Sequence, residues 1–232
     1  MKRCSFAFYN LAPASDPMRG EVQVKQELTA IANLVDPQTG KRKRPKVFGV
    51  CEAVGRPLPA LRRYEMLRTR ENPSKANVAL YVRDDLRHGE PRWVMHEKRW
   101  PKIFGPGFHD PRATLVVRVE NWRVVVAHAP QAPREVFPQA TQDALEDARK
   151  EWLDIMQRLL DRDGPVLLLS DPNGLADELK QRMHALDTEG ATGEAVHALG
   201  AHVKDFQLLG EANGVVMMSD HHQFRTGDAV KP

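Results

Sequence analysis

Seven polar residues lie where apolar segments of this sequence end, and their side chains could carry out metal and acid–base chemistry. Each one sits at or just beyond the C-terminal end of a run that predicts a buried strand. They are Asn10, Glu52, His128, Asp171, Asn173, Asp220 and His221. A strand end fixes the backbone while its side chain meets solvent, which suits a catalytic group. Each residue alone also has a structural explanation, such as a turn or a hydrogen-bonded core histidine. Their joint occurrence is what points to a site.

The oxygen-bearing side chains in this set favour Mg²⁺, with Mn²⁺ as the alternative. Three carboxylates and the Asn10 amide are hard ligands, and Mg²⁺ often takes one or two carboxylates and leaves other positions to water and phosphate. Zinc would favour His or Cys ligands in a spacing such as HExxH or CxxC, and the sequence contains neither. The imidazoles of His128 and His221 are then free to bind phosphate oxygens or to move protons. This inventory predicts metal-assisted phosphoryl chemistry.

The elements that must position these residues follow from the hydrophobic pattern. Apolar stripes with helical spacing predict helices over 21–35, 139–161 and 175–186. Short apolar or β-branched runs predict strands over 5–11, 47–51, 64–70, 77–83, 114–119, 122–127, 166–169, 206–209 and 215–218. The stretch 190–200 is rich in Gly and Ala and is expected to be irregular. No repeat or linker interrupts the chain, so we expect one mixed α/β domain over residues 1–232.

Composition narrows the class of protein. The 232 residues include 34 basic and 31 acidic side chains, a hydrophobic fraction of 41% and two cysteines. These values are typical of a soluble globular chain without a disulfide framework. The apolar runs are too short to cross a bilayer, and residues 1–10 lack the apolar core of a secretory signal. We therefore expect a cytoplasmic, non-secreted protein of bacterial or phage type, with no membrane contact and no obligate protein partner.

Charge is distributed unevenly along the chain. Residues 1–116 carry ten more basic than acidic side chains, and residues 117–232 carry seven more acidic than basic. A basic half indicates an anionic partner such as nucleic acid, unless the two halves neutralise each other. Five of the six residues in 41–46 are basic, so this loop is either a solvated loop or a phosphate-binding loop beside the site, in which Lys43 and Arg44 would contact substrate. Arg112 could reach a substrate phosphate or pair with a surface carboxylate, and Trp100 could stack bases or pack beneath a loop.

Six segments in a fixed order resemble the endonuclease/exonuclease/phosphatase superfamily, which has the DNase I-like fold. They are Phe8–Leu11, Gly49–Glu52, Val126–Pro130, Leu169–Asn173, Asp205–Leu209 and Ser219–His222. The resemblance implies a four-layer α/β sandwich, in which two packed mixed β-sheets are flanked by helices and the site lies at the loops along one edge. The chain departs from the family's usual Gly-Asp-Phe-Asn in having Ser170-Asp171-Pro172-Asn173. Its 47 residues from Asn173 to Asp220 are also few for the family.

The resemblance also implies roles for individual residues. Glu52 corresponds to the principal metal ligand, with Asn10 and Asp220 beside it. Asp171 would orient or deprotonate the attacking water, and Asn173 would hold the phosphate or that water. His128 and His221 would bind non-bridging phosphate oxygens, and Asp205 would hydrogen-bond His221. Asn77, grouped with the substrate-binding candidates, lies near the place of the carboxylate that supports the first histidine in some members, and an amide could serve there.

Three functions remain open on the sequence alone. The first is a Mg²⁺-dependent nuclease that hydrolyses DNA or RNA by in-line attack of an activated water, with nucleic acid as its partner. The second is a phosphatase or phosphodiesterase acting on small molecules or lipid headgroups, because a fold does not fix a substrate. The third is a binding protein that has lost catalysis, although the intact set of Glu52, His128, Asp171 and His221 argues against it.

Overall fold

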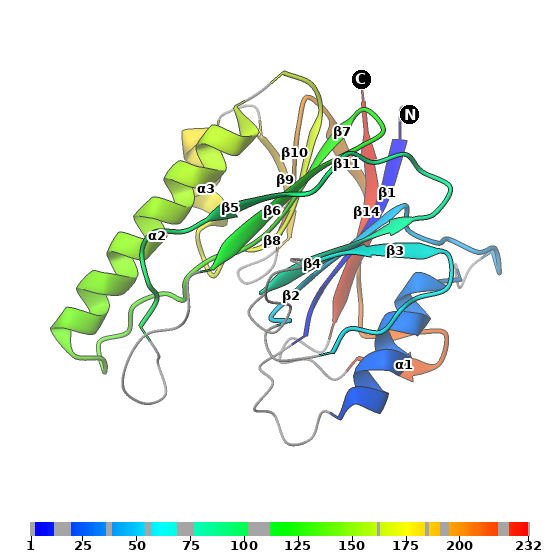
Figure 1. The fold of residues 1–232 in the computed structure, drawn as a ribbon, viewed down its shortest axis with the longest axis horizontal. Helices are drawn as coiled ribbons and strands as arrows, with labels where there is room; N and C mark the ends of the chain where they lie inside the picture. The colour runs from blue at the N-terminus through cyan, green and yellow to red at the C-terminus, as the bar shows by residue number, and fades with distance from the viewer. Residues whose placement is uncertain are drawn as a thin grey trace.

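Two six-stranded mixed sheets pack face to face in the computed structural model (Figure 1). The structure describes residues 3–11, 20–35, 39–53, 57–68, 77–101, 112–161, 163–183, 186–190, 195–217 and 223–231. The first sheet has the order β11 (His202–Leu209), β14 (Phe224–Val230), β1 (Arg3–Asn10), β2 (Val47–Cys51), β4 (Val78–Arg83), β3 (Tyr64–Leu67). The second has the order β5 (Arg92–Met95), β6 (Ala113–Val119), β7 (Trp122–His128), β8 (Val166–Asp171), β10 (Ala195–Leu199), β9 (Leu186–Gly190). A small hairpin, β12 (Glu211–Ala212) with β13 (Val215–Val216), completes the described strands.

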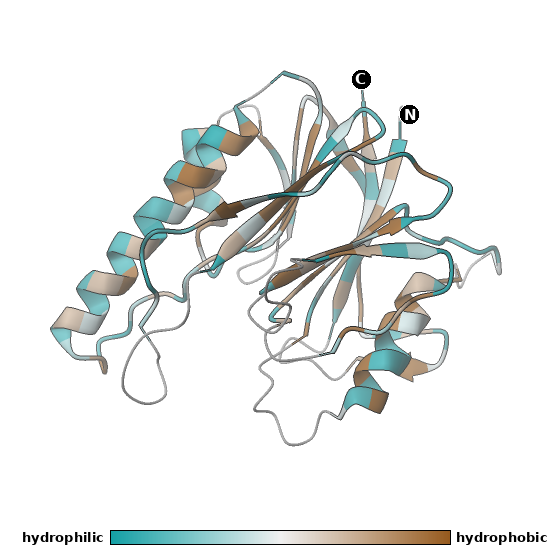
Figure 2. Cartoon of the chain, in the orientation of Figure 1, coloured by the Kyte–Doolittle hydropathy of each residue, from teal (hydrophilic) through white to brown (hydrophobic). Residues whose placement is uncertain are grey.

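Helices cover the outer faces of the sandwich. Helix α1 (Glu21–Ala32) lies on the first sheet, and α2 (Gln139–Leu160) and α3 (Ala176–Arg182) lie on the second (Figure 1). Figure 2 shows α2 with a hydrophobic stripe toward the sheet and a hydrophilic face outward. The four-layer α/β/β/α sandwich expected from the resemblance is therefore confirmed. Within the described ranges, no helix has both the length and the apolar character needed to cross a membrane.

The central strands are apolar on both faces because each face is covered. In β1, Phe6 and Phe8 enter the core between the sheets, whereas Ala7 and Tyr9 enter the core beneath α1. This two-residue alternation is what a strand buried on both sides requires. Gly49 of β2 marks a close approach of the two sheets, because a Cβ atom there would lie 3.0 Å from Cδ1 of Leu169 in β8.

Expectations for two segments in the later part of the chain were wrong. Residues 195–199 of the stretch expected to be irregular form β10, which pairs with β8 and β9 and buries Val196 and Ala198. Among the described residues of the segment 215–218, the strand is the short β13, and the last core strand is β14, which pairs with β1 along six residue pairs. In both places tertiary pairing decides the structure, and local composition carries little of that information.

Candidate active site

Four of the expected residues come together where parallel strands end. Strand β1 runs parallel to β2, and β7 runs parallel to β8, so their C-terminal ends meet at one edge of the sandwich (Figure 1). Asn10 is the last residue of β1, and Glu52 directly follows β2. His128 and Asp171 end β7 and β8 and are register partners across that pair. Because the sheets pack closely beneath this edge, two residues from each sheet face one another.

Asn10 joins the two carboxylates of the cluster. Its Nδ2 donates to Oδ2 of Asp171 at 2.8 Å and to Oε1 of Glu52 at 3.1 Å. Both hydrogen bonds lie in a largely buried environment, so the amide holds the carboxylates at a fixed separation. Asn10 thus acts in this structure as a donor that orients the acids.

A divalent cation would fit between the carboxylates of Glu52 and Asp171, beside the His128 ring. One ligand atom from each of these residues lies within 4.8 Å of the other two. Nε2 of His128 is 3.5 Å from Oε1 of Glu52 and 3.8 Å from Oδ2 of Asp171. Two carboxylates that converge in a buried place repel each other, and a bound cation would compensate their charge. The donors are mainly oxygen, which suits a hard cation.

Asp171 is the most deeply buried acid of the site, with 1% of its surface exposed. Burial raises its pKa to about 7, and the nearby Glu52 carboxylate adds to that shift, while hydrogen bonds from Asn173 and Asn10 oppose it. The backbone N–H of Asn173 donates to Oδ1 of Asp171 at 3.0 Å. A carboxyl group that titrates near neutrality can accept a proton from a water molecule at physiological pH.

Two amides bracket the His128 ring. Nδ2 of Asn77 lies 2.6 Å from Nδ1, and Nδ2 of Asn173 lies 3.3 Å from Nε2. The expected contact between Asn77 and His128 is therefore present. Asn77 is only 3% exposed, so its place is behind the histidine and not on a surface open to substrate. Asn173 is also held by its Nδ2 donating to the carbonyl of Ala129 at 2.7 Å.

Backbone geometry directs two of these side chains. Glu52 has φ = 56° and Asn173 has φ = 45°, both in the left-handed region that few residues other than glycine adopt. At Glu52 this conformation follows directly after the extended strand β2. Strain of this kind concentrates at functional sites, and no local sequence signal indicates it at Glu52.

An aromatic side chain lies next to His128, and a basic side chain lies next to that aromatic ring. The Trp100 ring lies edge-on to His128 with centroids 5.8 Å apart, and the Arg112 guanidinium lies 5.5 Å from the centroid of Trp100. Trp100 is buried, which supports its interpretation as a packing residue. Arg112 contacts the Trp100 ring, and its contact with a substrate phosphate stays a prediction.

Arg149 of α2 is a positioning residue that the sequence analysis missed. Its Nη1 donates to the carbonyl oxygens of Pro130 at 3.1 Å and Asn173 at 2.9 Å. One guanidinium therefore links the loop after β7 to the loop after β8. Its one signal in the sequence is its position in the predicted helix, directly after the apolar residue Ala148.

The structure does not bring Asp205 to this site. Its carboxylate is 61% exposed and accepts a hydrogen bond from Nη2 of Arg3 at 3.0 Å. Arg3 begins the eight-residue strand β1 that Asn10 ends, so the two ends lie about 23 Å apart at about 3.3 Å per residue. A bulge in β11 and φ = 52° at Asp205 accompany this outward position. Its expected partner His221 and the expected ligand Asp220 lie outside the described residues.

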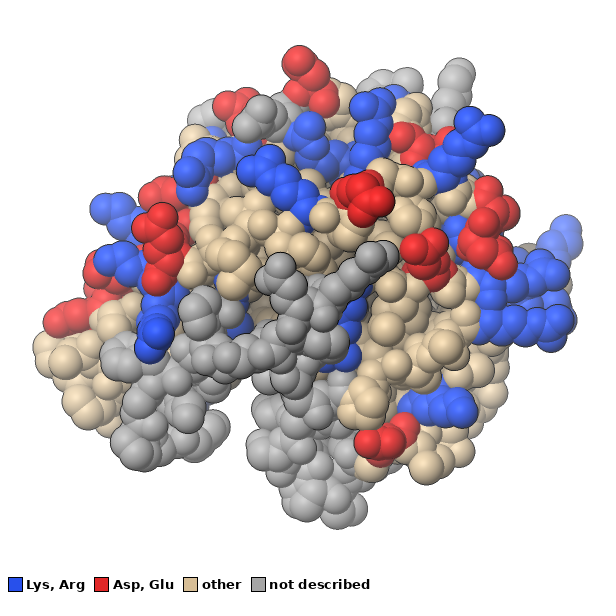
Figure 3. All heavy atoms as spheres, in the orientation of Figure 1, with Lys and Arg blue, Asp and Glu red and all other residues tan. Residues whose placement is uncertain are grey.

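Lys43 and Arg44 are also far from the site. The loop that carries them enters β2 at Val47, whereas Glu52 follows the other end of that strand. The expectation of a phosphate-binding loop beside the site is therefore wrong. Figure 3 shows Lys and Arg side chains gathered at the right-hand edge of the molecule, where the segment between α1 and β2 protrudes in Figure 1.

Comparison with known proteins identifies the fold. No family model and no curated protein sequence matches the chain. Among solved structures, an endonuclease/exonuclease/phosphatase family protein from Bacteroides thetaiotaomicron matches with a TM-score of 0.65, 16% identity and coverage of 99% of this chain and 95% of that chain. The human Nocturnin catalytic domain with bound sulfate matches with a TM-score of 0.61 and 12% identity, over 99% of this chain and 94% of that chain. TDP2 from Caenorhabditis elegans matches with a TM-score of 0.58 and 13% identity, over 98% of this chain and 75% of that chain. The chain has the fold of these proteins, the DNase I-like sandwich.

Proposed function

We propose that this protein is a divalent-metal-dependent phosphodiesterase and that its substrate is a nucleic acid. The observation that carries the proposal is the buried cluster of Asn10, Glu52, His128 and Asp171 at the strand ends. Two acids and an imidazole around a common point suit a cation and a phosphate. The excess of basic residues in the first half of the chain supports a polyanionic substrate.

The residues of the cluster divide the work of hydrolysis. Glu52, with Asp171 beside it, would hold Mg²⁺ or Mn²⁺, which when bound stabilises negative charge on the phosphate and the leaving oxygen. Asp171 accepts the proton of the attacking water, because its buried carboxylate lies beside the position of the cation and the phosphate. Asn173 positions the water or a phosphate oxygen with its amide. His128 donates a hydrogen bond to a non-bridging oxygen and stabilises the charge that develops there.

The test is hydrolysis of labelled single-stranded DNA, duplex DNA and RNA with Mg²⁺, Mn²⁺ or EDTA. A small aryl phosphodiester and a phosphate monoester are assayed in parallel. Variants Glu52→Gln and Asp171→Asn are compared with Asp163→Asn, which changes an exposed acid at the opposite end of β8 from Asp171. We expect metal-dependent cleavage of the polymer, a loss of at least a hundredfold in both site variants, and full activity in Asp163→Asn.

Two results would change the proposal. Turnover of the small esters alone, abolished by the same variants, would replace the nuclease with a small-molecule phosphoesterase that uses the same site. Absence of turnover on every substrate and metal would leave a binding protein and refute the enzyme.

A further inference from the structure

The edge of the sandwich opposite the candidate site carries a loop rich in basic side chains. We call residues 41–46 the basic loop. Lys41 and Arg42 are exposed, and Lys43 and Arg44 are partly buried. In the part of the chain that the structure describes, none of these four side chains forms an ion pair, and Nε of Arg44 is buried without a partner. Cations gathered on one loop repel one another, and an anion would relieve that repulsion.

The backbone of the basic loop is held in place. The N–H of Lys43 donates to the carbonyl of Leu34 at 2.7 Å, and Arg42 forms a bridge with Val35. The Tyr64 hydroxyl donates to the carbonyl of Pro45 at 2.7 Å. These contacts tie the loop to the end of α1 and to β3. A fixed backbone lowers the ordering cost when the loop binds a ligand.

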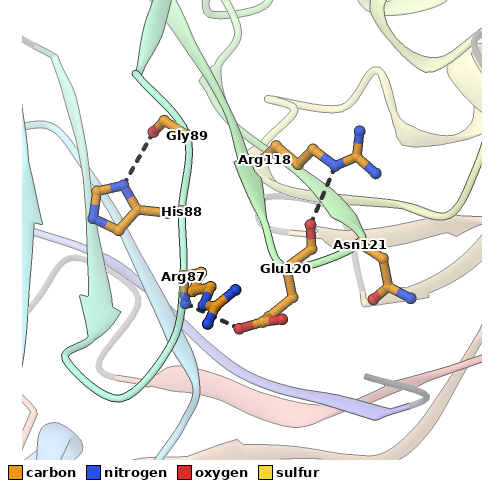
Figure 4. Close-up of a pocket in the computed structure, with 6 residues that line it drawn as sticks. All are labelled: Arg87, His88, Gly89, Arg118, Glu120 and Asn121. Carbon is orange, nitrogen blue, oxygen red and sulfur yellow. Dashed lines mark hydrogen bonds between the residues drawn. The ribbon is translucent and has the colours of Figure 1, made fainter.

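A pocket with two more arginines opens at the same edge (Figure 4). It has a volume of about 350 Å³ and is lined by Arg87, His88, Gly89, Arg118, Glu120 and Asn121. The pocket lies at the turn between β6 and β7, the opposite end of β7 from His128. Nε of Arg118 donates to the Glu120 carbonyl at 3.2 Å, which anchors the guanidinium. Neither Arg87 nor Arg118 forms an ion pair with a described residue, so the single Glu120 carboxylate leaves the pocket net positive.

The pocket and the basic loop are linked through the backbone. Arg83, at the end of β4, donates its N–H to the carbonyl of Lys46 at 3.1 Å. Four residues further on, the same chain reaches Arg87 at the pocket. The basic loop and the pocket therefore lie at the same end of the sandwich, and between them the carboxylate of Asp85 forms an ion pair with Arg83.

We propose that this edge binds the sugar–phosphate backbone of a nucleic acid, at a surface separate from the active site. The loop sequence KRKRPK has no apolar side chain other than Pro45 to insert into a bilayer, which favours a soluble polyanion over a lipid surface. Arginine guanidinium groups bind phosphate oxygens in pairs, and the edge offers four arginines, Arg42, Arg44, Arg87 and Arg118. That the ligand is a nucleic acid rests on the proposed function. That the surface is separate from the active site rests on its position at the ends of β2 and β7 opposite to Glu52 and His128. A substrate that fills only the active site would not reach this edge, so the edge would tether long polymers.

Binding without catalysis provides the first test. Fluorescence anisotropy measures the affinity for a labelled single-stranded DNA of about thirty nucleotides in EDTA over a range of salt concentrations. The loop variant combines Lys41→Gln, Arg42→Gln, Lys43→Gln and Arg44→Gln, and the pocket variant combines Arg87→Gln and Arg118→Gln. A milder loop variant changes only the exposed Lys41 and Arg42 to Gln, in case the fourfold change disturbs the fold. The control removes four basic side chains elsewhere, with Arg134, Lys150, Arg158 and Lys180 changed to Gln.

We expect the loop variant to lose at least tenfold in affinity at low salt. The plot of log affinity against log salt concentration should become less steep, by about 0.7 in slope for each phosphate that the variant no longer neutralises. The pocket and milder loop variants should each lose less than the fourfold variant, and the control should bind like the wild type. Equal losses in loop variant and control would overturn the proposal, because net charge alone would then explain binding. Loop-dependent binding to anionic vesicles without loop-dependent binding to DNA would also overturn it.

A second measurement separates this proposal from the proposed function. Hydrolysis of a small phosphodiester should be unchanged in both edge variants, because it uses only the active site. If the protein hydrolyses no substrate, the proposed function is refuted. The binding experiment in EDTA would still decide whether this edge binds DNA. Loss of small-diester hydrolysis in the milder loop variant would contradict a separate surface.

Discussion

The side-chain amide of Asn77 lies 2.6 Å from Nδ1 of His128, and both residues are buried. When the amide nitrogen donates, Nδ1 is the acceptor, so the hydrogen of the neutral ring resides on Nε2. That nitrogen faces Glu52 and Asp171. A carboxylate in the position of Asn77 would instead accept a hydrogen from Nδ1 and favour the charged ring. The amide thus selects the tautomer that His128 presents to the site.

Removing this amide should impair His128 without affecting the rest of the site. We expect Asn77→Ala to lower kcat on a small phosphodiester by about 10- to 100-fold, the usual effect of losing a group that orients a catalytic residue. Asn77→Asp should move the ring hydrogen to Nδ1, which ¹⁵N NMR of the histidine side chain detects directly. An unchanged tautomer in Asn77→Asp would contradict this account. Thermal unfolding of both variants controls for loss of the fold.

Arg149 should matter for turnover more than for substrate binding. Arg149→Met keeps much of the side-chain length but removes both hydrogen bonds to the loops that follow His128 and carry Asn173. We expect kcat to fall about tenfold or more with little change in KM, because the loss disturbs the geometry of reacting groups. Arg149→Lys should recover part of the activity, since one ammonium can reach one carbonyl. The matched control is Lys150→Met, an exposed change one residue away on α2; equal losses in both variants would exclude the positioning role.

The stability of the metal-free protein should depend on pH through Asp171. Its pKa is raised from 3.8 to about 7, so between these values the folded state binds the proton more tightly than the unfolded state does. The stabilisation from this group is therefore complete below about pH 4 and is lost as pH rises through 7. We expect wild type to lose on the order of a few kcal/mol relative to Asp171→Asn between pH 4 and pH 8. Urea unfolding in EDTA at several pH values measures this difference, and parallel pH profiles for the two proteins would contradict it.

Strand-end residues could be predicted from the sequence because two simple rules govern them. Alternation of apolar residues locates buried strands, and parallel neighbours end at the same edge, which brings Asn10, Glu52, His128 and Asp171 together. Arg149 could not be found in this way, since its function depends on how α2 lies over two loops. Asp205 shows the opposite failure: a matching segment in the right order does not fix which way a side chain points once a bulge intervenes.

A divalent cation should stabilise the protein, and protons should compete with it. A ligand that binds only the folded state raises its stability in proportion to the logarithm of ligand concentration. Because Asp171 binds a proton near pH 7, we expect the Mn²⁺ or Mg²⁺ concentration for half-maximal thermal shift to be higher at pH 6 than at pH 8. Glu52→Gln should abolish the shift, and Glu146→Gln on the exposed face of α2 should leave it intact. A shift that survives Glu52→Gln would place the cation elsewhere.

The close approach of the sheets at Gly49 should couple packing to activity. A Cβ atom at this position would lie 3.0 Å from Cδ1 and 3.2 Å from Cβ of Leu169, and 3.2 Å from Cδ2 of Phe8, so Gly49→Ala must displace Leu169 and Phe8 by a few tenths of an ångström. We expect a loss of about 1 to 3 kcal/mol in unfolding free energy, the usual cost of overpacking a core.

Leu169 lies two residues before Asp171, and Gly49 lies three before Glu52, so the same displacement separates the two acids that Asn10 bridges. Activity at a temperature where the variant is fully folded should therefore also fall, and Gly49→Ala combined with Leu169→Val should recover part of it. Gly89→Ala, where the added carbon would meet Cβ of Arg118 at an ordinary contact distance of 4.0 Å, is the control and should change neither property.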